Sequence, residues 1–318
     1  MFEARPHSFK TFMKMNQNLL GNVHGILGGS RYDTAAFQSW ASSRTVDFNA
    51  AKAWTVPSHI LACIPESVPA LLGCSGNGST LSVIRDIDLL DFFAGQARIS
   101  KWALIGGLNA VAFDRVYGSH MDLIDVGGFA MAIVLLLRVQ LTGLVMLGPQ
   151  CSTWVWVNRK VSQRSRGNPD GNDAHRLTHE GNVLNKRVAL LCQLASLIGV
   201  QWVVEQPTSS LFFLTAAMMF VVKRNLARRI HFWMAHYGAS TKKGTQLVGT
   251  ATWLASLSSR ETETTKNNGR QTKASAATLG VQTKKKYFGN HKALKASQVY
   301  PVKFALIILQ RHWPHVFR

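Results

Sequence analysis

Residues 87–114 carry the hydrophobic pattern of a β-α-β unit in one continuous stretch. An apolar run of strand length comes first, then a turn of small residues, a helix closed by two glycines, and a second short apolar run. In chain order these segments are residues 87–93, 94–97, 98–107 and 110–113, and Asp114 follows the last of them. The pattern predicts two parallel strands joined by a helix, with paired glycines suited to a left-handed cap.

The rest of the chain to about residue 310 continues the alternation of helices and strands. Apolar spacing predicts helices at 125–140, with Asp125 as N-cap, and at 182–197, 211–222 and 294–309, with a basic helix at 223–229. Short apolar runs predict strands at 143–147, 200–204 and 245–249. This alternation predicts an α/β fold with a Rossmann-like sheet and helices on both faces.

Composition divides the chain into four parts. Residues 1–84, rich in glycine and proline, form an N-terminal extension with short helices around 33–54 and 58–63, and residues 85–250 form the core. Residues 251–293 are basic and polar, which predicts a solvated or disordered insert. Residues 294–318 return to the core as a C-terminal helix.

The turn at 94–97 has the features of a ligand cradle. In a βαβ unit a ligand lies over the carboxyl end of the first strand, and an acid about 20 residues beyond the turn can bind ribose hydroxyls. Asp114 stands at that distance from Gly95. A single glycine does not meet a pyrophosphate-binding fingerprint, so a nucleoside without pyrophosphate suits the turn better. A plain packing turn remains the alternative.

Two other strand ends carry polar or reactive side chains. The strand at 143–147 leads into Gly148-Pro149-Gln150-Cys151, with Trp154, Trp156 and Arg159 close behind, and the strand at 200–204 leads into Glu205. Carboxyl ends of parallel strands share one edge of the sheet, so these residues are expected beside the cradle. The alternatives are a buried structural cysteine, a backbone-capping glutamate, and tryptophans that only pack in the core.

Charge is concentrated in the last third of the chain. The formal charge is +20, and from Lys223 onward 18 Lys or Arg residues face only Glu261 and Glu263, which gives 18 − 2 = +16. Such a surface attracts a polyanion, most commonly nucleic acid, although an anionic membrane or simple solubility would also explain it.

Other features limit the compartment and the chemistry. The four cysteines form no C-x-x-C pair and favour a reducing compartment, and the N-terminus lacks the apolar core of a secretory signal. The apolar runs 127–137 and 211–222 are too short to span a bilayer and are expected as buried helices. His175, His179 and Glu180 lack a third well-spaced partner, so no metal site is predicted there.

Taken in order, these pieces resemble the S-adenosylmethionine-dependent cytosine-5 DNA methyltransferases over residues 87–310. The segment 91–95 (DFFAG) resembles the family's cofactor turn, Asp114 its ribose-binding acid, and 148–151 (GPQC) the loop that carries its nucleophile. Glu205-Gln206-Pro207 is similar to the glutamate motif, and 237–247 and 297–304 resemble later family regions. Five pieces in the same order are more specific than any one.

The resemblance implies S-adenosylmethionine as cofactor and nucleic acid, DNA rather than RNA, as partner. The implied location is the nucleus or another DNA-containing compartment. The cofactor-binding residues would be Asp91, Phe93, Ala94, Gly95, Asp114, Gly148 and Pro149. By the same resemblance the Cys151 thiolate would add to C6 of cytosine so that C5 can accept a methyl group. Glu205 would orient the base, and Arg159 would lower the pKa of the thiol.

The sequence departs from the family at several of these positions. Gln150 replaces the proline before the cysteine, Gln206 an asparagine and Ala97 a glycine, while Lys242-Lys243 only loosely replaces a later Q-x-R-x-R motif. Activity is therefore left open. The alternatives are a nucleic-acid-binding protein of the same fold whose catalysis has decayed, a Rossmann-like methyltransferase for another substrate, and a membrane-associated helix protein.

Overall fold

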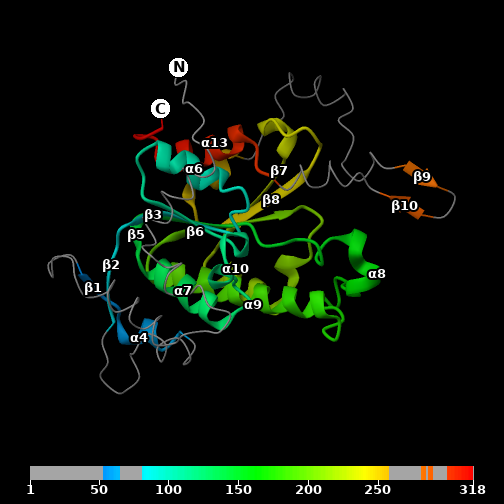
Figure 1. Cartoon of the computed structure of the whole chain (residues 1–318), viewed down its shortest axis with the longest axis horizontal. Helices are drawn as coiled ribbons and strands as arrows, with labels where there is room; N and C mark the ends of the chain where they lie inside the picture. Colours follow the sequence, from blue (N-terminus) through cyan, green and yellow to red (C-terminus); the bar gives the residue numbers. More distant parts are fainter. Residues whose placement is uncertain (1–52, 65–80, 258–280, 284–285, 289–298, 318) are drawn as a thin grey trace.

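A mixed six-stranded sheet lies at the centre of the computed structural model, which describes residues 53–64, 81–257, 281–283, 286–288 and 299–317 (Figure 1). The strands follow the order β4-β3-β5-β6-β8-β7. Their bounds are Ile87–Phe92 (β3), Ala110–Phe113 (β4), Val139–Leu147 (β5), Gln201–Pro207 (β6), Arg228–Trp233 (β7) and Gly244–Gly249 (β8). The α/β class is confirmed, and the architecture is compatible with a Rossmann-like fold.

The order of the strands creates a crevice at one edge of the sheet. Strands β4, β3, β5 and β6 are parallel, β8 is antiparallel to β6, and β7 is antiparallel to β8. The chain leaves β3 for β4 on one side and then returns to β5 on the other side of β3. Ligands of open α/β sheets bind outside the carboxyl ends of the strands at such a reversal.

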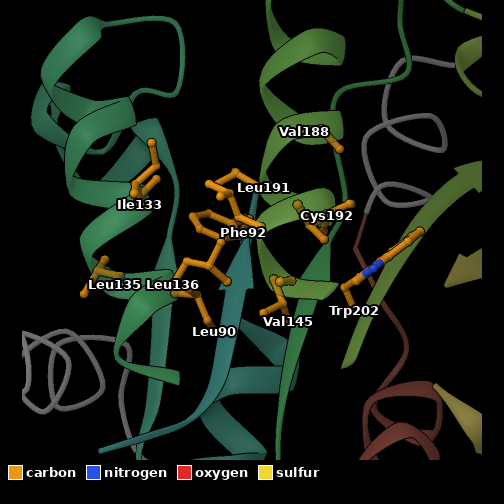
Figure 2. Close-up of a cluster of buried hydrophobic side chains, with 14 of the residues drawn as sticks. Leu90, Phe92, Ile133, Leu135, Leu136, Val145, Val188, Leu191, Cys192 and Trp202 are labelled. Carbon is orange, nitrogen blue, oxygen red and sulfur yellow. The ribbon is translucent and has the colours of Figure 1, made fainter. Parts of the chain in front are cut away.

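Helices cover both faces of the sheet. Helices α7 (Val126–Leu137), α9 (Arg176–Leu197) and α10 (Ala216–Arg224) lie on one face, and α6 (Arg98–Ile105) and α13 (Val302–His312) lie on the other (Figure 1). In Figure 2, Leu90, Phe92 and Val145 of the sheet meet Leu136 of α7 and Leu191 of α9. Every residue of α7 from Gly127 onward is buried, as expected for the apolar run.

The predicted βαβ unit is confirmed closely. Strand β3, helix α6 and strand β4 occupy the expected segments, and Gly107 after the helix has a φ of +83°. The N-cap prediction for α7 is also confirmed, because the Asp125 carboxylate accepts the N–H groups of Gly127 and Gly128.

Three boundaries differ from the predictions. Helix α7 ends at Leu137 and β5 begins at Val139, earlier than predicted, because Val139 pairs with Ile87. Helix α9 begins at Arg176, before predicted residue 182, with an Arg176–Glu180 ion pair in its first turns. The predicted helices 211–222 and 223–229 were partly wrong: α10 covers Ala216–Arg224 with Met219 and Phe220 exposed, and residues 228–233 form β7.

The flanking parts pack on the same core. Strand β1 (Ala53–Thr55) pairs with β2 (Ser82–Ile84), and α4 (Ser58–Leu61) falls where a short helix was predicted. Val56, Ile60 and Val83 join the core beside α7. The other predicted N-terminal helix lies outside the described residues apart from its end in β1.

The basic polar segment and the C-terminal helix are described only in part. Residues 252–257 form a 3-10 helix (Thr252–Leu257) with Leu254 and Leu257 buried in the core. The rest of the predicted insert lies outside the described residues, except for the paired strands β9 (Val281–Thr283) and β10 (Lys286–Phe288). Helix α13 begins at Val302, and no helix in the described ranges is long and apolar enough to cross a bilayer.

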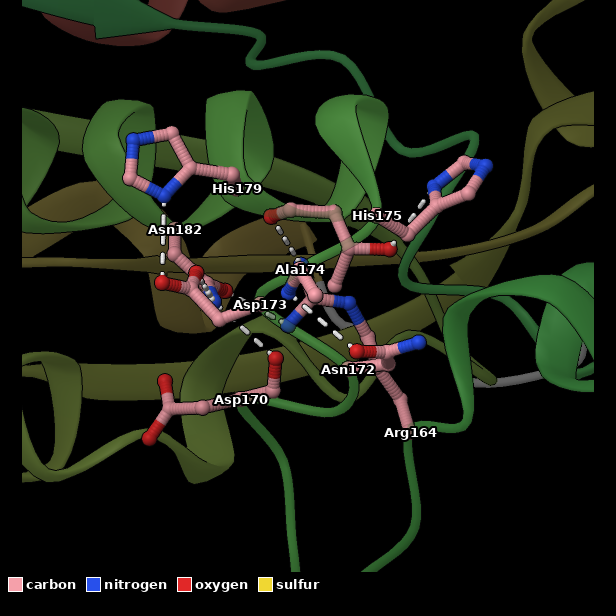
Figure 3. A network of polar contacts seen from close by, with 9 residues as sticks. Arg164, Asp170, Asn172, Asp173, Ala174, His175, His179 and Asn182 are labelled. Atoms are coloured by element: carbon pink, nitrogen blue, oxygen red, sulfur yellow. Dashed lines mark hydrogen bonds and ion pairs between the residues drawn. The ribbon is translucent and has the colours of Figure 1, made fainter.

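A buried arginine fixes the loop between β5 and α9. The Arg164 guanidinium donates to the carbonyl oxygens of Pro169 (2.6 Å) and Thr178 (3.1 Å) and to Asn182 Oδ1 (2.8 Å), and it stacks 3.4 Å from the centre of the Trp154 ring. Asn182 in turn donates to Asp173 Oδ1 (Figure 3). The loop between β5 and α9 is therefore held by a polar network against the start of α9.

Replacement of this arginine should destabilise the protein. Arg164→Ala should lower the free energy of unfolding by about 3 kcal/mol, because buried carbonyl oxygens lose their donor. Urea unfolding followed by circular dichroism measures the change. Arg166→Ala, at an exposed position of the same loop, should change it by less than about 0.5 kcal/mol. Equal effects of both substitutions would contradict a structural role for the network.

Candidate functional site

A cavity of about 540 Å³ opens at the carboxyl ends of the parallel strands, at the reversal between β3 and β5. Its wall combines the turn after β3, the residues after β4 and β5, Glu205 of β6, and side chains from beyond the parallel strands. Of the residues predicted from the sequence, Phe93, Ala94, Gly95, Asp114, Gly148, Pro149, Cys151 and Glu205 line it. The expectation that these strand ends meet is confirmed.

The turn after β3 is held from the end of β4. Gly95 has a φ of +56°, and a Cβ built there would meet no atom within 4 Å. Its N–H donates to Asp114 Oδ2 (2.9 Å), and its carbonyl oxygen accepts the Tyr117 hydroxyl (2.7 Å). Two hydrogen bonds thus fix a glycine whose open side faces the cavity.

Asp91 lies beneath this turn, not on the cavity wall. It is buried, and its carboxylate accepts the hydroxyl of Ser100 (2.7 Å) in the first turn of α6. The pKa of Asp91 is raised to about 7, because burial, assisted by Asp114, outweighs the lowering effect of the hydrogen bonds from Ser100. Asp91 was predicted to contact a cofactor, and in the structure its carboxylate is bonded to the start of α6.

Asp114 stands where the acid of a ribose site was expected. Its Oδ1 accepts the N–H of Val116 (3.0 Å) and its Oδ2 that of Gly95, which leaves further lone pairs on both oxygens. Met121, Asp122 and Leu123 follow on the same wall. These three residues were missed by sequence reasoning, because nothing in their spacing distinguishes them from an ordinary loop.

The Cys151 loop is fixed by the residue after Glu205. The Gln206 amide, fully buried, donates to the Pro149 carbonyl oxygen (2.6 Å) and accepts the Ser210 hydroxyl (2.8 Å). The Cys151 carbonyl oxygen accepts the N–H of Trp154 (2.9 Å). The loop therefore has its own support although Gln150, not a proline, precedes Cys151.

Glu205 is the centre of a buried charged cluster. Its Oε1 lies 3.3 Å from the Lys243 ammonium, and its Oε2 accepts the Tyr300 hydroxyl at 3.3 Å. The Lys243 contact is an ion pair without good hydrogen-bond geometry, so Oε1 keeps lone pairs for another donor. Tyr300 also limits the space beside Gly148, where a Cβ would come 2.6 Å from its hydroxyl oxygen.

The electrostatics of this cluster favour a neutral thiol beside a charged pair. Burial raises the pKa of Cys151, Lys243 lowers it, and Glu205 raises it, with burial the largest effect. Burial would lower the pKa of Lys243, but Glu205 and Cys151 raise it above its ordinary value. Burial and Glu205 hold the pKa of Tyr300 well above its usual range, so it serves as a donor.

Arg159 does not join the cluster. It is exposed at the start of α8 (Arg159–Ser162) and does not line the cavity, because turns over residues 152–158 carry the chain outward. The cation beside Cys151 is Lys243, which follows the antiparallel return of the chain to β8. The cation that lowers the pKa of the Cys151 thiol is Lys243, not Arg159 as predicted.

The tryptophans and histidines that follow Cys151 in the sequence lie outside the charged cluster around Glu205. Trp154 is buried edge-to-face against Phe212 (5.2 Å between ring centres), whereas Trp156 is 62% exposed. His179 pairs with Asp173 at 3.1 Å, and His175 contacts Thr178. Within the described part of the chain, His, Cys, Asp and Glu side chains form no group of three that could hold a metal ion.

No protein-family model matches the chain, and a search of curated proteins finds no significant match.

The link between Lys243 and Cys151 can be tested by alkylation. Lys243→Met removes the positive charge that lowers the Cys151 pKa, so the pH profile of iodoacetamide modification should move to higher pH. At neutral pH the reaction should become several-fold slower. Mass spectrometry of the Cys151 peptide measures the rate separately from the other cysteines.

Two further variants are the controls for this prediction. Lys243→Arg keeps the charge and should preserve the rate, and Arg159→Met should leave the profile unchanged because Arg159 is exposed outside the cavity. If Arg159→Met shifts the pH profile and Lys243→Met does not, Lys243 is not the cation that lowers the Cys151 pKa.

Proposed function

We propose that the protein is an S-adenosylmethionine-dependent methyltransferase that acts on cytosine C5 in nucleic acid. The single observation that carries the proposal is the meeting of three chemistries in one cavity: the Gly95 and Asp114 cradle, the Cys151 thiol, and the Glu205 carboxylate. They come from three different strand ends. The resemblance predicted these residue types in this order, and a packing role alone does not require them on one wall.

The cradle residues fit a nucleoside cofactor. The open side of Gly95 allows close approach to the backbone, and the free lone pairs of Asp114 can accept ribose hydroxyls. Met121 and Leu123 offer apolar contacts for a base, and the cavity volume is in the range of small-molecule sites. When bound there, S-adenosylmethionine would supply an electrophilic methyl group.

Cys151 and Glu205 have the roles that cytosine chemistry requires. Cytosine C5 is a weak nucleophile, and addition of the Cys151 sulfur to C6 raises electron density at C5. The free lone pairs on Glu205 Oε1 can accept a hydrogen bond from the amino group of the base, while Tyr300 and Lys243 hold the carboxylate in place. Because the thiol pKa is raised, the adding thiolate forms more readily as pH rises.

A second function is favoured by one observation. Burial raises the pKa of Cys151 more than Lys243 lowers it, which favours the neutral thiol over the nucleophilic thiolate. A protein of the same fold that binds nucleic acid without modifying it would tolerate such a thiol. Ligand binding and adduct formation, measured separately, distinguish the two functions.

The cofactor prediction concerns Asp114. Calorimetry should detect binding of S-adenosylmethionine or its demethylated product, and Asp114→Ala should weaken it roughly 5- to 150-fold, or about 1–3 kcal/mol. Asp170→Ala, an exposed acid distant from the cavity wall, should have no effect. Thermal unfolding of the Asp114 variant separates a lost ligand contact from a collapsed turn. Absence of heat with either ligand would refute the proposed cofactor.

The chemical prediction concerns a covalent adduct. With S-adenosylmethionine as the methyl donor, an oligonucleotide that contains 5-fluorocytosine should remain bound to the protein in denaturing electrophoresis, because fluorine cannot be eliminated from C5 after methyl transfer. Cys151→Ser should abolish the adduct, and Glu205→Gln should reduce its rate by about 10²-fold. The rate for the wild type should rise with pH as the Cys151 thiol ionises.

The exposed Cys63 provides the matched control, since Cys63→Ser should leave the adduct unchanged. Wild-type protein that binds both cofactor and nucleic acid but never forms the adduct would instead support the non-catalytic alternative.

A further inference from the structure

A row of basic and aromatic side chains lies on one face of the edge strand β7. Ile230 and Phe232 point into the core, whereas Arg229, His231 and Trp233 alternate with them and are exposed. Lys242, in the turn before β8, places its ammonium 4.3 Å from the centre of the Trp233 ring. These four residues, Arg229, His231, Trp233 and Lys242, are called the β7 strip.

The strip belongs to a segment without acidic residues. Residues 206–257 contain six Lys or Arg and no Asp or Glu: Lys223, Arg224, Arg228, Arg229, Lys242 and Lys243. Positive charge here is therefore not neutralised by carboxylates of the same segment. A partner with regularly spaced negative charges complements such a surface.

The backbone at Trp233 runs beside the turn that carries Lys243 into the cavity lining. Trp233 pairs with Gly244 across the β7–β8 ladder, and a Cβ at Gly244 would come 3.2 Å from the indole. Glycine thus lets the ring lie against the backbone while 40% of Trp233 stays exposed. The Lys243 carbonyl oxygen accepts the Met234 N–H (2.8 Å), and Lys243 itself lines the cavity. The strip and the cavity are therefore neighbours through Lys242 and Lys243.

We propose that the β7 strip binds an unpaired nucleic-acid strand that enters the cavity. A base next to the one in the cavity stacks on Trp233, and Lys242 and Arg229 contact phosphates along the strand. This inference rests on the proposed function for the identity of the base in the cavity, but the binding itself is separable from catalysis. It defines the substrate as a single strand or a locally opened site.

An unpaired strand explains the strip better than an intact duplex. Aromatic side chains that bind nucleic acid without sequence preference stack on base faces, and those faces are covered by neighbouring bases in a duplex. A target base must also leave its stack to reach a thiol inside a cavity, which costs least in a single strand. In the free protein the Lys242 ammonium lies over the Trp233 ring, so a base that stacks there displaces it from the ring face toward the adjoining phosphate.

Fluorescence anisotropy with labelled oligonucleotides of about 12 residues tests the proposal on the full chain. Single-stranded oligo-dT and oligo-U should bind more tightly than a duplex of the same length. Trp233→Ala should weaken single-strand binding roughly 5- to 150-fold, and Trp233→Phe, which keeps a ring, should recover most of it. The DNA and RNA arms show which strand is preferred.

The salt dependence tests the cations of the strip. Lys242→Ala should reduce the slope of log affinity against log salt by about 0.7, the value for one phosphate contact on a single strand. Lys303→Ala, exposed on α13 at the opposite face of the sheet, should leave the slope unchanged. Thermal unfolding of each variant confirms that the fold is retained.

The outcomes separate this proposal from the proposed function. Single-strand binding that depends on Trp233 but occurs without cofactor binding would support the strip and refute the methyltransferase. Cofactor binding and adduct formation, together with unchanged single-strand affinity in Trp233→Ala, would support the methyltransferase and refute the role of the strip. Tighter binding to the duplex, together with no effect of Trp233→Ala, would overturn the assignment of the strip.

Discussion

The Glu205 carboxylate, buried at the end of β6, sets the arrangement of the whole cavity. An isolated charge in such a place is strongly unfavourable, so it requires partners that replace water. Lys243 comes from the chain before β8, and Tyr300 from the segment before α13. One carboxylate thereby connects β6, β8 and the C-terminal helix beside Cys151. The need to compensate this charge explains why residues so distant in sequence meet at one point.

The Cys151 loop shows how the chain departs from the family resemblance while it keeps an ordered loop. With Gln150 in place of a proline, the backbone before the cysteine has more conformational freedom in the unfolded chain. Gln206 provides a restraint in the folded state, since its buried amide joins Pro149 to Ser210. The two departures are therefore linked through space, because the longer amide side chain of Gln206 supports the loop that contains Gln150.

Local patterns allowed much of the fold to be predicted. The βαβ unit, α7 and the strand ends could be read from apolar runs, glycines and an N-cap, because neighbouring residues determine them. Strand β7 could not, since only Ile230 and Phe232 of its six residues are buried and the basic residues before them follow directly on a helix. Two buried residues in alternation are too few to distinguish a strand from a continuation of the preceding basic helix.

Part of the candidate site depends on contacts between segments whose separation in the sequence does not predict that they meet. Gly95 and Asp114 were predictable because one βαβ unit fixes their separation, whereas Lys243 reaches Glu205 only through the antiparallel pairing of β8 with β6. Nearness in sequence favoured Arg159, but the turn after Cys151 carries it to the surface.

The same antiparallel return has a second effect. It brings the start of β8 to the site edge of the sheet, where Lys243 faces the cavity and Lys242 faces Trp233 outside it. Of two adjacent lysines, one therefore contacts a buried carboxylate and the other contacts an exposed ring. Lys243 pairs with Glu205 within the protein, whereas Lys242 lies against the exposed Trp233 ring. Lys242 is therefore the lysine placed to contact a negatively charged partner.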